Sequence, residues 1–354
     1  MKVGILFHKN PLAEPSSIDL IRLRAIAGGL IRRGISTEVL APVDQEGILD
    51  GSIPLFPLHH LMKGRYDIIK TSYHFSIELI QDYAGPVVSR IVRVVDDRLP
   101  ERDEQWRKRL ISCQQQISRR SSVLVLNNTE NQSRWQHFYG HGLPIILVPT
   151  GCPMQIPEPR KNPFHQKKRN ILFLGSIAAP RMIALMNAMA DRLEHMANIH
   201  IIGLNKARWY GMADESTLHP SITQHGEIRE EDTWDYLFHA DMGLALATGP
   251  HVFDNDLSKI YNYLRGGLPV LSESPVLNND LIRQTGLGRI FQFGNVEDLI
   301  AASVSLLENP PTLERRNAAM NFMSTDHAWE RRIDIYEKLF KKLITEQVQS
   351  HHNP

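Results

Sequence analysis

The segment from Asp254 to Leu271 combines residue types that could bind an anionic group. Its polar lead-in is followed by an expected short helix, Leu257–Arg265, and by two glycines that end this helix before a buried strand. The first backbone N–H groups of a helix have no partner within the helix, and together with the helix dipole they favour negative charge. Ser258 and Lys259 lie in this first turn. A lysine there opposes the dipole, so a bound phosphate would explain its position; the alternative is a solvated surface lysine.

Two further polar residues follow expected strands in the first half of the chain. His74 comes shortly after the expected strand 66–71, and Asp96 comes directly after the expected strand 87–95. Ligands of doubly wound sheets bind at the carboxyl ends of the strands, so both residues are candidates for a site. The alternatives are that His74 is part of a polar surface and that Asp96, with Asp97, caps the following helix.

Two successive series of strands and helices must position these residues. The first series opens with strand 2–7, helix 18–33 and strand 37–42, and a second series restarts at strand 170–174. A stretch rich in proline and basic residues separates them. The pattern predicts an α/β protein with two doubly wound, Rossmann-like domains that face a cleft. We expect the first domain over 1–152, a linker over 153–168, the second domain over 169–328 and a C-terminal helix, 329–354, that returns to the first domain.

Composition narrows the class of protein further. The chain has 354 residues, which suits two domains, and its net charge of +1 gives no global attraction to nucleic acid. Its two cysteines, Cys113 and Cys152, lack the spacing of a thiolate metal site and favour a reducing compartment. The apolar start of the chain is too short for a signal peptide or a membrane span. We therefore expect a cytoplasmic protein, with the inner face of the membrane as a further location.

Several other chemistries lack their sequence motifs. The first strand is not followed by G-x-G-x-x-G, which disfavours a nicotinamide or flavin dinucleotide site. The chain also lacks the nucleophile elbow G-x-S-x-G, the zinc motif H-E-x-x-H and the Walker A loop. Hydrolases of the α/β type, zinc proteases and ATPases are therefore disfavoured.

The 254–271 segment resembles the donor-binding segment of GT-B glycosyltransferases, especially the retaining, metal-independent group 1 enzymes (family 4). In that pattern an acidic residue, seven further residues and a second acidic residue precede a small-residue turn and Gly-x-Pro-Val. Asp254 falls at the first acidic position, and Gly267–Val270 closes the pattern. Lys259–Leu264 resembles a variant, Lys-Ile/Leu-Tyr-Glu-Tyr-Leu. Asn262 stands where the family has its second acid, and this is the main departure.

The resemblance implies a role for each candidate residue. Asp254 would bind hydroxyl groups of the donor sugar, and Asn262 would bind the ribose. The acceptor would lie in the first domain, so that the implied catalytic residues are His74, Asp96 and Asp254. The remaining donor-binding residues would surround the diphosphate and the base: Gly175, Ser176, Arg181, Gly226, Glu227, Ser258 and Lys259.

These observations favour a nucleotide-sugar-dependent hexosyltransferase in the synthesis of a polysaccharide or glycoconjugate. The donor would be UDP- or GDP-linked, the acceptor a glycan, a lipid-linked sugar or a small molecule, and neither a metal nor another cofactor is expected. Two alternatives stay open: a nucleotide-sugar epimerase on the same fold, and a non-catalytic, sugar-binding partner subunit. The cation-rich helix Arg102–Arg120 predicts peripheral contact with an anionic membrane, or else is a solvated helix packed through its apolar stripe.

Overall fold

The computed structural model describes residues 1–13, 18–80, 83–96, 104–158, 161–165, 167–205, 217–251 and 256–352. The contacts between residues divide the chain into two compact units. The first unit comprises Met1–Gly151 and Ala328–Pro354, and the second comprises Cys152–His327. The segment 153–168, expected as a linker, therefore falls within the second unit.

The described part of the first unit is built on an eight-stranded sheet in the order β3-β4-β2-β1-β5-β6-β7-β8. Paired strands run parallel except β3 and β4, which are antiparallel. The strands are β1 (Lys2–Leu6), β2 (Ser36–Ala41), β3 (Gly47–Leu49), β4 (Ile53–Pro57), β5 (Ile68–Thr71), β6 (Val87–Arg90), β7 (Val123–Leu126) and β8 (Ile145–Leu147). The helices are α1 (Ile18–Arg32), α2 (Glu104–Arg120), α3 (Thr129–Tyr139) and α10 (Trp329–His352), with 3-10 helices η1 (Leu58–Met62) and η2 (His74–Leu79).

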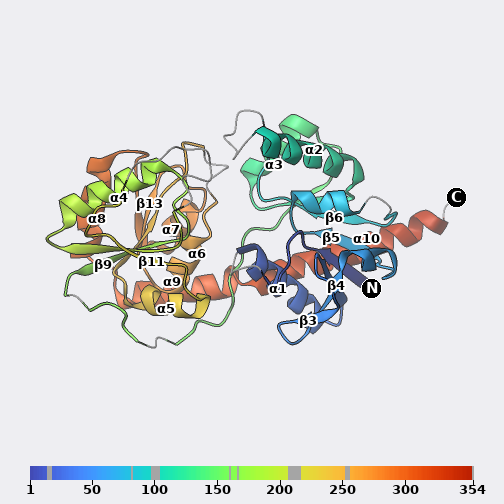
Figure 1. Cartoon of the computed structure of the whole chain (residues 1–354), viewed down its shortest axis with the longest axis horizontal. Coiled ribbons are helices and arrows are strands. Elements are labelled where there is room, and N and C mark those ends of the chain that lie inside the picture. Colours follow the sequence, from blue (N-terminus) through green and yellow to red (C-terminus); the bar gives the residue numbers. More distant parts are fainter. Residues whose placement is uncertain are drawn as a thin grey trace. The chain divides into compact units, whose positions relative to one another are not determined.

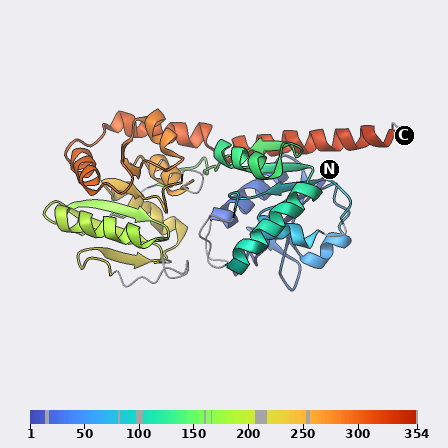
Figure 2. The same cartoon turned by 90° about the horizontal axis from the view of Figure 1, so that it is seen from above.

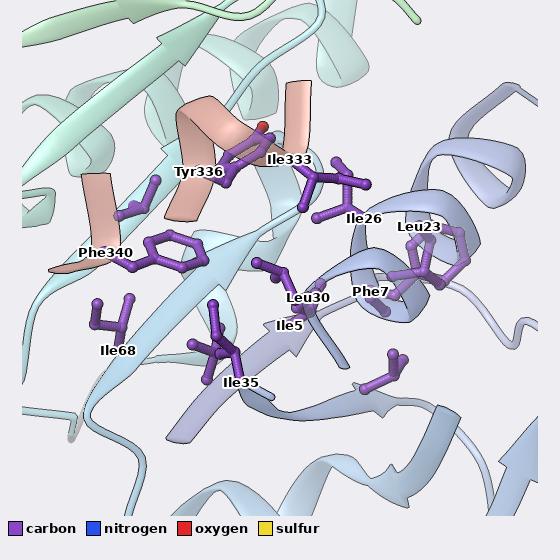
Figure 3. Packing of buried hydrophobic residues seen from close by; sticks show 14 of the residues in the cluster. Ile5, Phe7, Leu23, Ile26, Leu30, Ile35, Ile68, Ile333, Tyr336 and Phe340 are labelled. Atoms are coloured by element: carbon purple, nitrogen blue, oxygen red, sulfur yellow. The ribbon is translucent and has the colours of Figure 1, made fainter. Parts of the chain in front are cut away.

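Helices α1 and α10 cover one face of this sheet and close its larger core. Apolar side chains of β1 and α1, such as Ile5 and Ile26, meet Tyr336 and Phe340 of α10 (Figure 3). Gly29 lets α10 approach α1, because a Cβ atom at this position would lie 2.1 Å from the Cδ1 atom of Ile333. The helix after the second series of strands thus completes the core of the first unit.

The described part of the second unit holds a fully parallel, six-stranded sheet in the order β11-β10-β9-β12-β13-β14. Helices α4 and α8 pack on one face, while α5, α6, α7 and α9 contribute to the core on the other face (Figure 1; Figure 2 shows α4 in yellow-green). The strands are β9 (Arg169–Leu174), β10 (Ala197–Ile202), β11 (Thr223–Gly226), β12 (Met242–Ala245), β13 (Val270–Glu273) and β14 (Gly288–Phe291). The helices are α4 (Pro180–Leu193), α5 (Glu230–His239), α6 (Lys259–Arg265), α7 (Asn279–Thr285), α8 (Val296–Glu308) and α9 (Leu313–Asp326).

Two expected elements are shorter in the structure. The strand expected over 87–95 ends at Arg90, because the N–H groups of Val94 and Val95 bond to side chains of α3 and α2 and leave the sheet. The helix expected from Leu257 begins at Lys259, and the N–H of Leu257 donates to the side chain of Asn278. By contrast, the C-terminal helix expected over 329–354 is helical from Trp329 as far as His352.

Candidate functional site

Three glycines lie at the carboxyl ends of neighbouring strands in the second unit. Gly175 follows β9, Gly203 follows β10, and Gly226 ends β11; their φ angles are +90°, +139° and +69°. The N–H of Gly175 donates to the carbonyl of Ile202, and the N–H of Gly203 donates to the carbonyl of Gly226. A Cβ atom on Gly203 would lie 2.2 Å from the carbonyl oxygen of Gly175. Only glycine fits this packing and these angles, and the resulting turns leave the backbone of Gly175 exposed to a ligand.

The ammonium group of Lys259 lies beside this glycine edge. It sits 3.6 Å from the centroid of the Phe173 ring, and it would be 3.9 Å from a Cβ atom on Gly175. No carboxylate among the described residues is within ion-pair distance of it. Burial lowers the pKa of Lys259 to about 7, because the charged form has lost much of its hydration. A partly desolvated cation with no counter-ion among the described residues, next to an exposed backbone turn, is suited to bind an anion.

The position of Lys259 depends on the buried residue Tyr263 of the same helix. The Tyr263 hydroxyl accepts from the N–H of Leu174 at 2.8 Å and lies 3.1 Å from the carbonyl oxygens of Leu172 and Leu244. It therefore bridges β9 and β12 where the two strands stop pairing with each other. Gly243 makes room for the ring, since a Cβ there would lie 2.6 Å from it. From β9 the chain adds strands toward one edge of the sheet, and from β12 it adds them toward the other edge. The boundary between β9 and β12 is therefore the topological switch point, where doubly wound folds bind ligands.

The first turn of α6 has fewer free backbone donors than the sequence predicts. The N–H groups of Ile260 and Tyr261 donate to the carbonyls of Leu257 and Ser258. Ser258 is the N-cap residue in helical conformation, and its side chain makes no capping bond. The expectation of a row of unpaired N–H groups is therefore wrong for these two positions. The capacity of this turn to bind an anion therefore rests on the Lys259 side chain rather than on the backbone N–H groups at the start of the seven-residue helix.

The other candidate residues of the 254–271 segment are placed as follows. Asn262 is partly buried on α6, and none of the hydrogen bonds among described residues uses its side chain. Asp254 lies outside the described residues. Asp256 accepts a hydrogen bond of 2.7 Å from the side chain of Asn278, and this ties the start of α6 to the segment before α7.

Arg181, expected to contact phosphate, is engaged with a buried carboxylate. Its guanidinium forms an ion pair with Glu273, donates to the carbonyl of Ala247 at 2.6 Å and lies over the ring of Phe293. The Glu273 side chain is fully buried and also accepts from the N–H groups of Ala247 and Gly294. Its donors thus come from α4 and from the loops after β12 and β14. Sequence reasoning missed Glu273; the one signal was an acid at the end of an apolar strand.

Ser176 and Glu227 follow β9 and β11 at the same edge as Gly175. Ser176 is partly exposed, and Glu227 is exposed. Both are open to a ligand that lies along these strand ends.

In the first unit, His74 and Asp96 are both buried. The His74 side chain is 1% exposed, and its Nε2 lies 3.1 Å from the carbonyl oxygen of Arg93. Burial lowers the pKa of His74 to about 3, so the imidazole is neutral and donates its Nε2–H to that carbonyl. Asp96 forms an ion pair with Arg134 of α3. Asp97 lies outside the described residues.

A metal-binding group of side chains and a membrane-spanning helix are both absent from the described residues. No group of three or more histidine, cysteine, aspartate or glutamate side chains could hold a metal ion there. None of the described helices is long and apolar enough to cross a membrane.

No protein-family model matches the sequence, and no curated protein sequence matches it. Solved structures, in contrast, match nearly the whole chain. Sucrose-phosphate synthase from Thermosynechococcus elongatus is 12% identical over 99% of this chain and 98% of its own, with a TM-score of 0.69. Anabaena HepE in complex with UDP is 12% identical over 97% and 100% of the two chains, with a TM-score of 0.70. WaaG, a glycosyltransferase involved in lipopolysaccharide biosynthesis, is 16% identical over 94% and 99%, with a TM-score of 0.68.

These similarities identify the class of fold. The chain has the α/β fold of GT-B glycosyltransferases, with a doubly wound, Rossmann-like sheet in each unit. The predicted fold class is confirmed.

Proposed function

We propose that the protein is a nucleotide-sugar-dependent glycosyltransferase that transfers a hexose to a glycan, lipid-linked or small-molecule acceptor. The observation that carries the proposal is the position of the Lys259 ammonium group beside the exposed Gly175 turn. This group has no counter-ion among the described residues, and it lies at the topological switch point of a GT-B sheet. HepE, similar in fold, was crystallised with UDP and with UDP-glucose, which supports a UDP-linked donor.

In this reaction the bond between the anomeric carbon and the diphosphate oxygen breaks, and an acceptor oxygen forms a bond to that carbon and loses its proton. Charge grows on the departing diphosphate, so a fixed cation lowers the barrier most when it contacts that group. Lys259 supplies this charge, and the turn at Gly175 and Ser176 lets the backbone approach the phosphates. Asp254 and Asn262 bind the sugar and ribose hydroxyls, and Gly226 and Glu227 lie at the base. Arg181 contributes through its ion pair with Glu273, which joins the loops after β12 and β14.

A panel of radiolabelled UDP-, GDP- and dTDP-sugars tests the proposal, after a thermal-shift screen has selected the donors that bind. Transfer to an acceptor, or slow donor hydrolysis, supports a glycosyltransferase. Interconversion of the sugar without an acceptor would instead identify an epimerase. Binding without any turnover would identify a non-catalytic sugar-binding subunit, for which Asn262 in place of an acid would be the reason.

Catalysis should not require a metal ion. If Lys259 neutralises the diphosphate, incubation with excess EDTA should leave turnover within about twofold of the untreated enzyme. The spacing of Asp254 and Asp256 is formally that of a metal-binding Asp-x-Asp, so the test is a real one. Complete loss of turnover in EDTA, restored by manganese or magnesium, would show that this loop binds a metal.

We also propose peripheral contact between α2 and an anionic membrane, which would serve a lipid-linked acceptor at the inner face. The helix exposes Lys108 and Arg119, although Arg109 forms a bidentate pair with Glu78. Glutamate substitutions at Arg107, Lys108 and Arg109 should lower co-sedimentation with anionic vesicles severalfold, since each cation near such a surface contributes about 1 kcal/mol. Unchanged co-sedimentation would leave α2 as a solvated helix.

A further inference from the structure

A cluster of buried cations lies in the first unit, toward the carboxyl ends of β5 and β6. It consists of Lys70 on β5, Arg90 at the end of β6 and Arg22 on α1, whose exposed fractions are 2%, 3% and 9%. Asp19 on α1 is the carboxylate that the described residues place beside them. Its Oδ1 atom lies 2.7 Å from Nη1 of Arg22 and 4.0 Å from Nη1 of Arg90. We call Lys70, Arg90 and Arg22 the buried cation cluster.

Positive charge in the cluster exceeds the negative charge that the described residues supply. Lys70 donates a single bond of 3.3 Å, to the carbonyl of Thr71, and its Nζ lies 5.3 Å from the centroid of the Tyr336 ring. Among described residues, Nη1 of Arg90 and the fully buried hydroxyl of Tyr336 have no hydrogen-bond partner. Buried cations and polar groups are costly to leave without partners. Nη1 of Arg90 and the Tyr336 hydroxyl are therefore available as donors to a ligand.

Burial and neighbouring charges shift the pKa of Lys70. Burial is the main cause that lowers the pKa of its ammonium group, and the positive charges of Arg90 and Arg22 lower it further; Asp19 acts in the opposite direction. An anion bound here would reverse this balance and favour the protonated lysine.

We propose that the buried cation cluster binds the phosphoryl group of a phosphate monoester. Guanidinium groups match phosphate oxygens with paired N–H donors, and a lysine adds a point charge, so this combination suits a dianion better than a neutral sugar. The Tyr336 hydroxyl supplies a further donor. The carboxyl ends of the strands are also where open α/β sheets bind their ligands. This inference rests on the proposed function in one respect only, namely that the phosphate monoester is then the acceptor.

Calorimetric titration of the whole protein with inorganic phosphate tests the binding. The Lys259→Ala variant serves as the background, because phosphate would also bind at the proposed donor site. Phosphate should bind this background, and adding Arg90→Gln or Lys70→Met should weaken the binding at least tenfold. Adding Lys63→Met, which removes an exposed lysine of the same unit, should leave it unchanged.

Proton uptake gives a second readout that a purely structural role would not produce. Because the anion favours protonated Lys70, binding at a pH where phosphate is already the dianion should take up protons, measured by repeating the titration in buffers of different ionisation enthalpy. Lys70→Met should abolish the uptake. Arg90→Lys, which keeps the charge, should fold and bind with intermediate affinity, so a folding failure of Arg90→Gln would not decide the matter.

Either of two results would overturn the proposal: no phosphate binding by the background protein, or equal binding after Arg90→Gln and Lys70→Met in folded protein. Hexose phosphates and vesicles that carry a lipid phosphate monoester then distinguish a soluble from a lipid source. The outcome is separate from that of the donor panel. Donor turnover without phosphate binding removes the cluster proposal alone, whereas phosphate binding without donor turnover removes only the glycosyltransferase proposal.

Discussion

Replacing Lys259 with alanine should lower turnover by ~10²-fold or more, the range found when one donor to a developing oxyanion is removed. In the proposed reaction the lysine meets the growing charge of the diphosphate, from its position over Phe173 and beside Gly175. Steady-state kinetics with the donor selected by the panel measures the effect. Lys259→Met is the matched control, because it keeps the length and the packing over Phe173 and loses only the charge, and it should be as impaired as the alanine variant.

The pH dependence of donor binding follows from the same residue. Burial holds the pKa of Lys259 at about 7 in the free protein, below its ordinary value. A bound diphosphate favours the charged lysine and so raises this pKa. Affinity for a nucleotide sugar should therefore be highest below about pH 7 and fall by up to tenfold per pH unit above it, because binding then requires proton uptake. Lys259→Arg, which stays charged, should remove this fall while it restores turnover only partly.

The same shift has the opposite sign for the stability of the free protein. Between pH 7 and the ordinary lysine pKa, the unfolded chain binds more protons at this position than the folded chain does. This lysine therefore makes the free protein more stable as the pH rises through that interval.

Wild-type turnover in Lys259→Ala, together with unchanged affinity for the nucleotide diphosphate, would remove Lys259 from the site.

Replacing Glu273 with alanine should lower the free energy of unfolding of the second unit by about 3–5 kcal/mol, as expected when one partner of a buried ion pair is removed. Its fully buried carboxylate accepts from Arg181 and from the N–H groups of Ala247 and Gly294. All three donors lose their acceptor, and the loops after β12 and β14 lose a common anchor. Amide hydrogen exchange of β13, with urea unfolding of the whole chain, measures the loss where it occurs.

Two controls separate the ion pair from a general loss of packing. Glu297→Ala breaks the pair between Glu297 and Arg192, which is largely exposed, and should leave the free energy of unfolding nearly unchanged. The double variant Arg181→Met with Glu273→Leu should recover part of the stability that Glu273→Ala loses, because no unpaired buried charge remains. A Glu273→Ala variant within 1 kcal/mol of the wild type would contradict the anchoring role.

The class of fold and the bounds of the secondary structure in the 254–271 segment could largely be predicted from the sequence alone. Repeated strand–helix units predict doubly wound sheets, because parallel strands need helical crossovers. Gly266 and Gly267 predict the end of α6, and the apolar run after Pro269 predicts β13; the structure confirms both. These features are local, since helix ends and strand periodicity depend on residues only a few positions apart.

Which side chains meet could not be predicted from the sequence, because it depends on the packing of distant segments. His74 follows β5 as the sequence predicts, whereas Asp96 lies beyond the end of β6 at Arg90. His74 is buried at the start of η2, and Arg134, far along the chain, pairs with Asp96. The bridge from Tyr263 to the backbone of β9 and β12, and the anchor at Glu273, likewise join residues far apart in the chain. The spacing of residues within one element specifies its faces. Whether a polar side chain on such a face meets a ligand or a buried partner depends on distant segments that only packing brings into contact.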